Sequence, residues 1–501
     1  MSGRAPPIRD VVVAGGGIVG WSAAAALRKR LPALSVTVVP VPPPPDALAD
    51  RIGSTLPSIG EFHSDIGLTE ADTVGRIGSS FRLGTLFEGW AEDRPAYVHA
   101  YGEYGKPFGT ASFHQHWVRA AHLARPAPFD AFSTAATMAR AGRFVHPRGE
   151  PGSPLARFGY GLMINPGRYR EMMRAYARHL GAVEREGEIA EVRLRGRDGF
   201  VEAVRFTDGS QLRGDLFVDC TGPSRRLRDA IDDAFEEWSR WLACDRILFA
   251  DASPPAELPS LDKAVATGAG WRWEAASPLR TSHGMVYASE HLSDGKAARA
   301  LRVATEADAQ EAPVTLRPGR LAEPWVKNCV ALGDAAVAVE PLEWANLHLV
   351  HNMIDRMIAM MPDRDCGAVE LWDYNRQANA EADRIRDFLV LHYVASRRSE
   401  PFWRAAASVE PPSSLAHTLA LFRERGRLPF YEEETFSRDS WLAVLLGQGL
   451  IPRRTDPLIE IVAPAAAVEA MARMRGAIEA LIPTLPTHDH YLQTLTRQAA
   501  R

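Results

Sequence analysis

The chain has few cysteines, no excess of basic side chains and no long apolar run. Its 501 residues include 4 cysteines, spaced for neither a metal site nor a disulfide framework, so we expect a reducing, cytoplasmic environment. Lysine and arginine number 58 against 62 acidic residues, a net charge of −4, which argues against nucleic acid as a partner. A membrane-spanning helix needs about 18 consecutive apolar residues, so no membrane crossing is predicted.

Glycine is concentrated near the N-terminus, between a β-branched run and an alanine run. This order within Val11–Ala26 predicts a strand, a tight turn and a helix. Gly15, Gly17 and Gly20 have G-x-G-x-x-G spacing. In a dinucleotide turn the first glycine lets the chain turn, the second admits a pyrophosphate and the third lets helix and strand pack closely. The sequence therefore predicts a dinucleotide site.

The acidic residue that usually follows such a turn is missing. The second strand is predicted at Ser35–Val39, and Pro40 stands where Asp or Glu would accept a hydrogen bond from a ribose hydroxyl. Asp46 and Asp50 follow in and after a proline run, whose stiff, extended conformation gives no reason to expect a replacement.

Later segments place strands next to residues suited to a ligand. A buried strand is predicted within Asp215–Leu227, and another in Gly270–Leu279 puts Trp271 and Trp273 on one face. The segment Asn328–Met357 reads as a strand, a Gly-Asp turn and a helix, and the chain is mostly helical from residue 372 onward.

Metal ligands are not predicted. His114 with His116, and His488 with His490, are i, i+2 pairs with no third ligand in view, and such pairs are usually ordinary loop residues. On spacing alone, two tryptophans in one strand are also more often core residues than a functional motif.

Taken together, several segments resemble the flavin-dependent tryptophan halogenase family over almost the whole length. The matching segments are GGGIVGWSAA (15–24), STLPSIGEF (54–62), FRLGTLFEGW (81–90), DLFVDCTG (215–222), WRW (271–273), EPLEWANLHLV (340–350) and the late DSWLAVLLGQGLIPRRTDPL. The resemblance implies an α/β fold: a glutathione-reductase-like FAD-binding domain of Rossmann type (βαβ) with a mainly helical substrate domain. We assign residues 1–95, 155–240 and 315–375 to the first domain, and 96–154, 241–314 and 376–501 to the second.

The resemblance also implies the chemistry and its partners. A separate NAD(P)H-dependent flavin reductase would supply reduced FAD, which with O₂ converts chloride or bromide into hypohalous acid. That acid would travel through a tunnel to a small aromatic substrate such as an indole. A homodimer is one candidate for the assembly.

Roles for individual residues follow by matching positions. Arg82 stands where the family has a catalytic lysine, and Glu343 matches the glutamate that helps to place the electrophile. A guanidinium keeps the positive charge but practically never deprotonates, so it cannot form a haloamine. The matched cofactor residues are Gly15, Gly17, Gly20, Thr55, Gly333 and Asp334, and the matched substrate or halide residues are Trp271, Trp273, Trp344, Ala345 and Asn346.

Departures from the family pattern keep other functions open. Trp344 is large enough to reshape the halide turn, and Ala275 and Ala276 replace the Ile-Pro that follows the two tryptophans in the family. The alternatives are a flavin monooxygenase that does not halogenate and a degenerate, non-catalytic paralogue.

Overall fold

The computed structural model describes residues 5–124, 126–149 and 152–499. These residues form two compact units, each built from three stretches of chain. Unit 1 comprises residues 1–77, 164–239 and 314–383, and unit 2 comprises 78–163, 240–313 and 384–501. The outer bounds of the predicted domains, residues 1 and 501, lie outside the described residues.

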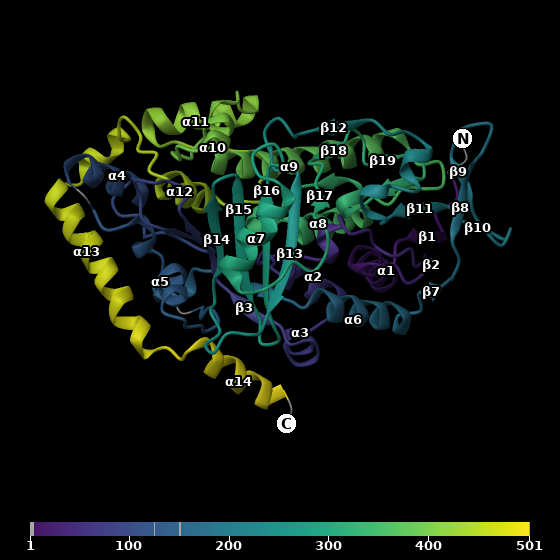
Figure 1. Cartoon of the computed structure of the whole chain (residues 1–501), viewed down its shortest axis with the longest axis horizontal. Coiled ribbons are helices and arrows are strands. Elements are labelled where there is room, and N and C mark those ends of the chain that lie inside the picture. The colour runs from purple at the N-terminus through teal and green to yellow at the C-terminus, as the bar shows by residue number, and fades with distance from the viewer. Residues whose placement is uncertain (1–4, 125, 150–151, 500–501) are drawn as a thin grey trace. The chain divides into compact units, whose positions relative to one another are not determined.

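Unit 1 is organised around a mainly parallel sheet with the strand order β19-β20-β11-β1-β2-β7 (Figure 1). Its valine-rich strands are buried, as expected of a parallel sheet covered on both faces. Only the β19–β20 pair is antiparallel. The strands are β1 (Asp10–Ala14), β2 (Ser35–Val39), β7 (Val183–Glu184), β11 (Leu216–Asp219), β19 (Trp325–Val326) and β20 (Cys329–Ala331). The predicted βαβ arrangement and second strand are confirmed.

Helices α1 (Ile18–Arg30), α6 (Pro166–His179) and α8 (Asn346–Ala359) belong to the same unit. Helix α6 begins at Pro166. The reason is local: the side chain of Asn165 accepts a hydrogen bond from the backbone N–H of Arg168, and Pro166 occupies the first helical turn.

Smaller elements complete unit 1. Two three-stranded sheets have the orders β10-β9-β8 and β12-β18-β21. Their strands are β8 (Ile189–Leu194), β9 (Val201–Phe206), β10 (Gln211–Arg213), β12 (Phe235–Glu237), β18 (Gly319–Leu321) and β21 (Val337–Ala338). Unit 1 also contains strand β17 (Val314–Thr315) and helices α2 (Ile59–Ile66) and α3 (Glu70–Ile77). Its short 3₁₀ turns are η1 (Leu48–Asp50), η4 (Gly222–Ser224), η5 (Arg228–Ala230), η6 (Gly333–Ala335) and η7 (Leu342–Trp344).

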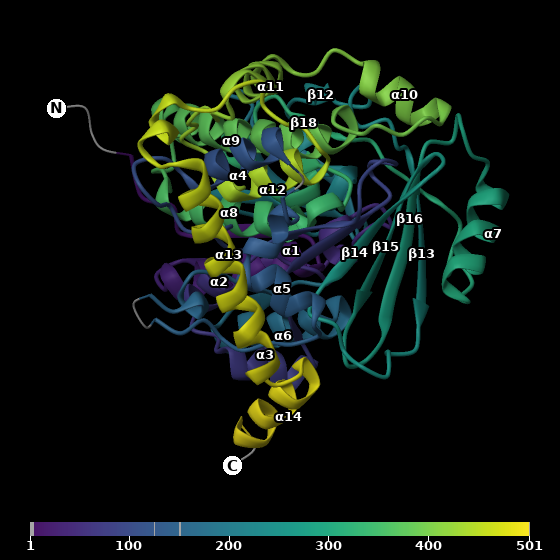
Figure 2. The same cartoon turned by 90° about the vertical axis from the view of Figure 1, so that its left-hand side faces the viewer.

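Unit 2 contains a sheet in which neighbouring strands follow the order β13-β16-β15-β14-β4-β5. Figure 2 shows β13 to β16 side by side, with α7 (Asp294–Thr305) beside β13. Its pairs are antiparallel except β14 with β4. The strands are β4 (Gly84–Glu88), β5 (Tyr97–Ala100), β13 (Arg246–Ala252), β14 (Asp262–Thr267), β15 (Gly270–Ala276) and β16 (Thr281–Tyr287), and β3 (Ser80–Arg82) pairs separately with β6 (Gly161–Met163).

Helices make up most of the remainder, which confirms the helical character predicted for the C-terminal part. They are α4 (Phe113–Leu123), α5 (Thr134–Arg140), α9 (Ala368–Val394), α10 (Pro401–Ser408), α11 (Ser413–Arg425), α12 (Arg438–Gly447), α13 (Pro464–Leu481) and α14 (His488–Ala499), with 3₁₀ turns η2 (Phe129–Phe132), η3 (Pro154–Ala156), η8 (Pro457–Ile461) and η9 (Ile482–Thr484). Helix α9 contributes residues to both units, which meet in sequence at residues 383 and 384.

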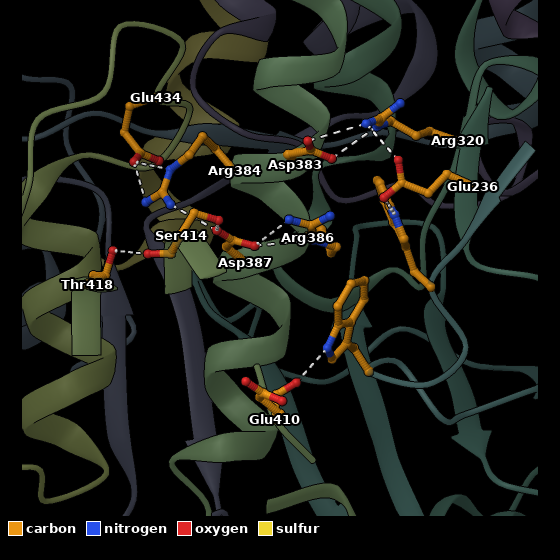
Figure 3. A network of polar contacts seen from close by, with 12 residues as sticks. Glu236, Arg320, Asp383, Arg384, Arg386, Asp387, Glu410, Ser414, Thr418 and Glu434 are labelled. Carbon is orange, nitrogen blue, oxygen red and sulfur yellow. Dashed lines mark hydrogen bonds and ion pairs between the residues drawn. The ribbon is translucent and has the colours of Figure 1, made fainter. Parts of the chain in front are cut away.

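A buried ionic network holds the second half of α9 (Figure 3). The carboxylate of Asp387 receives Arg384 at 3.0 Å and Arg386 at 2.9 Å, and Ser414 of α11 donates a hydrogen bond to it. Arg384 also pairs with Glu434 at 2.9 Å. Because every charge has an opposite partner, the network can exist in the core of unit 2.

Candidate functional site

The turn between β1 and α1 has the geometry that its glycine spacing predicts. Gly15 has φ = 142°, and a Cβ atom built there would lie 2.4 Å from the carbonyl oxygen of Cys220 at the end of β11. A Cβ atom on Gly20 would lie 2.1 Å from the carbonyl oxygen of Gly15. Real Cβ atoms are not found that close to backbone, so both glycines are required for the strand and helix to pack.

Gly17 serves a different purpose, because its missing side chain leaves room for an anion. A Cβ atom there would lie 2.3 Å from Oδ1 of Asp50. The same oxygen accepts a hydrogen bond from the backbone N–H of Ile18, the first residue of α1. A negative group therefore rests on the middle glycine and against the helix N-terminus, where phosphates bind in dinucleotide folds. These residues fit the pyrophosphate of a dinucleotide.

The second cofactor segment, Gly333-Asp334, lies in unit 1 directly after β20. Oδ2 of Asp334 accepts a hydrogen bond from the backbone N–H of Ala49 at 2.9 Å, which ties η6 to η1. Burial, together with the charges of Asp50 and Asp46, raises the pKa of Asp334 to about 7, although the hydrogen bond from Ala49 opposes this shift. Since β1, β11 and β20 are parallel neighbours, their carboxyl ends bring these turns to one edge of the sheet. A small cavity of about 30 Å³ beside Asp334, too small for a nucleotide, is lined in part by Asp46 and Glu340.

The predicted cofactor residue Thr55 lies in the same unit, as does Pro40, which stands in place of the expected ribose acid. Thr55 is buried in the loop between η1 and α2. Pro40 follows β2 directly: the carbonyl of Val39 accepts the N–H of Gly15 at 2.9 Å, and that of Val41 accepts the N–H of Gly16 at 2.7 Å. A Cβ atom on Gly16 would lie 3.0 Å from the Pro40 carbonyl. The residue that replaces the expected ribose carboxylate is thus beside the dinucleotide turn.

Glu343 and Trp344 form a backbone turn that is unusual for residues with side chains. Both have φ = 63°, in the left-handed region that favours glycine. Each such residue costs about 1 kcal/mol or more, and strained turns of this kind cluster at functional sites. Both side chains are 1 % exposed. Glycine would adopt this backbone with less strain, so the strain indicates that the side chains of Glu343 and Trp344 are needed at these positions.

The turn runs directly into α8, where the predicted halide residues Ala345 and Asn346 lie. Nδ2 of Asn346 donates to the carbonyl of Val339 at 3.0 Å, whereas its buried Oδ1 receives no hydrogen bond from the described residues. A buried acceptor without a donor costs about 1–3 kcal/mol, so a ligand donor would be favourable there.

Arg82 belongs to unit 2, in which it is held on several sides. Its Nε lies 2.7 Å from Oδ2 of Asp262, its Nη2 donates to Oγ1 of Thr85 at 3.0 Å, and its Nη1 donates to the hydroxyl of Tyr101. The guanidinium also faces the Tyr101 ring, with its carbon 5.1 Å from the ring centre. Arg82 and Asp262 are almost completely buried. The cation is therefore neutralised and fixed rather than mobile.

Trp271 and Trp273 also lie in unit 2, in the core on one face of β15. Their ring centres are 5.9 Å apart, and Trp90 is 6.4 Å from Trp271. A Cβ atom on Gly284 of β16 would lie 1.9 Å from the Trp273 ring, so the ring fits only because residue 284 is glycine. The structure gives both indoles a packing role, and their functional role stays a prediction.

Sequence analysis missed Asp262 and Tyr101, and it gave Asp50 no place in the site. Asp262 opens β14 opposite Thr85 of β4, and only the strand pairing brings it to Arg82. Among the residues that the structure describes, no cluster of His, Cys, Asp or Glu could hold a metal ion. Within the same residues, no helix combines the length and apolar character needed to cross a membrane.

The chain is similar to known proteins over nearly its whole length. A family model described as tryptophan halogenase matches residues 10–464. The tryptophan 6-halogenase SttH of Streptomyces toxytricini is 27% identical over 97% of this chain and 98% of its own.

Among solved structures, BrvH, a flavin-dependent halogenase from Brevundimonas sp. BAL3, is 34% identical with a TM-score of 0.92, covering 98% of this chain and 99% of its own. Xcc4156, a flavin-dependent halogenase from Xanthomonas campestris, is also 34% identical, with a TM-score of 0.90 and 98% of each chain covered. The protein described here therefore belongs to the tryptophan halogenase family, whose members are flavin-dependent oxidoreductases.

Proposed function

We propose that this protein halogenates a small aromatic compound, such as an indole, with reduced FAD, O₂ and chloride or bromide. A separate NAD(P)H-dependent flavin reductase supplies the reduced FAD. The observation that carries the proposal is that unit 1 contains both a dinucleotide turn at Gly15–Gly20 and the strained, buried turn at Glu343. Membership of the family supports the same reaction.

The roles of the unit 1 residues follow from their positions. The Gly17 gap and the N–H of Ile18 hold the pyrophosphate, and Thr55, Gly333 and Asp334 line the rest of the cofactor site. Bound reduced FAD, with O₂, supplies the oxidising equivalents that convert halide into hypohalous acid. The carboxylate of Glu343 accepts a hydrogen bond from that acid and orients its halogen. The segment from Trp344 to Asn346, which leads from η7 into α8, binds the halide.

Arg82 of unit 2 handles the electrophile through hydrogen bonds alone. Its guanidinium donates to the oxygen of the hypohalous acid and cannot form a covalent N–halogen bond as a neutral amine would. In the final step the arene gives up a proton, the carbon–halogen bond forms and water leaves. Trp271 and Trp273 support the walls of the substrate region.

Monooxygenation without halide is the second candidate function. Two features favour it. The Arg82–Asp262 pair lowers the positive potential available to an anion, and the bulky Trp344 takes up space at the halide turn. A non-catalytic paralogue that only binds cofactor is the third.

A single reaction series distinguishes these three functions. Purified protein is incubated with indole, FAD, NADH, a flavin reductase and bromide, and products are identified by mass spectrometry. We expect bromide-dependent brominated indole from the native protein and none from Glu343→Gln, because the amide no longer presents a charged acceptor. Glu323→Gln, the same change at an exposed site of unit 1, should retain activity. Hydroxylated product without bromide would establish monooxygenation, and FAD binding without any product would leave the non-catalytic function.

Location in the cytoplasm and assembly into a homodimer are also proposed. The reducing environment suggested by four free, buried cysteines supports the first. Light scattering of the purified protein tests the second.

A further inference from the structure

The carboxylate of Asp50 occupies the anion position of the dinucleotide turn. Asp50 is the last residue of η1, and its Oδ1 accepts a hydrogen bond from the N–H of Ile18, 32 residues earlier in the chain. Both of its carboxylate oxygens lie 2.3–2.4 Å from where a Gly17 Cβ atom would be. The contact is possible only because residue 17 is glycine.

In dinucleotide-binding folds, the pyrophosphate of the cofactor occupies that same position beside the middle glycine. The middle glycine lets the pyrophosphate approach the backbone, and the first N–H groups of the helix donate to it. Two anions at one N–H group also repel each other in a partly buried, low-dielectric setting. The Asp50 carboxylate and a pyrophosphate therefore cannot share the turn.

We infer that Asp50 is an internal competitor for the pyrophosphate of FAD, so that cofactor binding requires the ionised carboxylate to leave the turn or to be neutralised. This inference rests on the proposed function, because it takes FAD as the cofactor. It makes Asp50 a determinant of cofactor affinity, in addition to the residues that hold the cofactor.

If Asp50 only capped helix α1, removing its charge would have a different effect on FAD affinity. Gly17, the N-cap residue of α1, has no side chain, so Asp50 supplies the cap from a distance and stabilises the ligand-free protein. A cap with no competitor role predicts that removing the charge lowers stability and leaves FAD affinity unchanged. The competitor role predicts that FAD affinity rises.

The charges around Asp50 determine how the competition depends on pH. Asp46 precedes η1, Asp334 lies on η6 and Arg170 lies on α6. The thiol of Cys220, which directly follows β11, is neutral because burial raises its pKa. Burial raises the pKa of Asp50 to about 6, although the hydrogen bond from Ile18 and the charge of Arg170 lower it. The carboxylate is thus ionised at pH 8 and mostly neutral at pH 5, while the pyrophosphate keeps its charge throughout.

The test compares native protein with Asp50→Asn, which keeps an oxygen for the Ile18 N–H but carries no charge. FAD is titrated into ligand-free protein at pH 8 and pH 5, and binding is followed by flavin fluorescence and by the FAD-dependent rise in melting temperature. We expect Asp50→Asn to bind FAD at least about tenfold more tightly at pH 8, and the two proteins to converge at pH 5, because linkage allows up to about tenfold per pH unit above the pKa.

Two further variants make the outcome unambiguous. Asp65→Asn removes one acidic charge from an exposed position of unit 1, on α2, and it should bind FAD nearly as native protein does at pH 8. Asp50→Ser is a smaller neutral replacement that should show the same gain in FAD affinity. It keeps the test decisive if the Asp50→Asn protein misfolds. Equal FAD affinity of native protein and both Asp50 variants at pH 8 would overturn the competitor role alone, whereas a complete lack of binding by all of them would overturn the proposed cofactor as well.

Discussion

Nε of Arg82 lies 2.7 Å from Oδ2 of Asp262, and both side chains are almost completely buried. Two opposite charges at this distance form a buried ion pair, and removing one partner strongly destabilises the folded protein. The pair decides what a lysine at position 82 could do. A carboxylate next to an amine favours its charged form, and a charged ammonium cannot attack hypohalous acid.

Arg82→Lys alone should therefore leave bromination at or below the native rate. Arg82→Lys combined with Asp262→Asn should raise it at least about tenfold, which corresponds to about 1.4 kcal/mol of barrier, because the amine can then lose its proton. The rate of the double variant should increase with pH. Bromoindole formation is measured between pH 6 and 9, with Asp262→Asn alone as the control for misfolding. A gain with the single lysine variant would contradict the neutralised pair.

Pro40→Glu should tighten FAD binding, because residue 40 adjoins the dinucleotide turn through the contacts of Gly15 and Gly16. A charge-assisted hydrogen bond to a ribose hydroxyl is worth about 1.5–3 kcal/mol, or one to two decades in affinity. Pro42→Glu adds the same charge two residues later at an exposed position and should have little effect. Equilibrium dialysis with FAD distinguishes them, and equal affinities would show that residue 40 does not reach the ribose.

Asp387→Asn should lower stability by about 3–5 kcal/mol, because it leaves the buried guanidinium groups of Arg384 and Arg386 without their shared partner. Asp383→Asn is the matched control. The Asp383 side chain is 32 % exposed where it pairs with Arg320, so water replaces part of the lost interaction and the loss of stability should be smaller. The midpoint of urea unfolding reports both changes. Similar shifts for the two variants would show that burial of the network is unimportant.

Glu381 should make unit 1 sensitive to acid. Burial raises its pKa, but the hydrogen bond and charge of His348, with Arg356 and Asn352, outweigh this and lower the pKa to about 2. Because the folded pKa lies below the ordinary glutamate value of 4.5, this stabilisation is present above that pH and is lost as the pH falls toward 2. Melting temperatures between pH 6 and 3 should fall more steeply for native protein than for Glu381→Gln. Parallel curves would contradict the assignment.

The local parts of the site could be predicted from the sequence, and the parts that depend on distant contacts could not. Three glycines within six residues suffice to define the β1–α1 turn, and Pro40 marks the missing acid directly after β2. Asp262 had no local signal, because it reaches Arg82 only through the β14–β4 pairing. Asp50 was visible as an acid near the turn, but the proline run before it gave no direction for its side chain. The left-handed backbone of Glu343 and Trp344 contradicts residue propensity, which is why a sequence pattern could not predict it.

The arrangement of the unit 1 sheet has a consequence for how the protein is made. Strand β1 has β2 as one neighbour, but its other neighbour, β11, begins only at Leu216. At a synthesis rate of about 5–20 residues per second, the ribosome needs on the order of 10 to 40 seconds to add the intervening chain. During that time the backbone N–H and C=O groups on one edge of β1 are without their strand partner. We therefore expect the expression yield to depend on the speed of translation between β2 and β11.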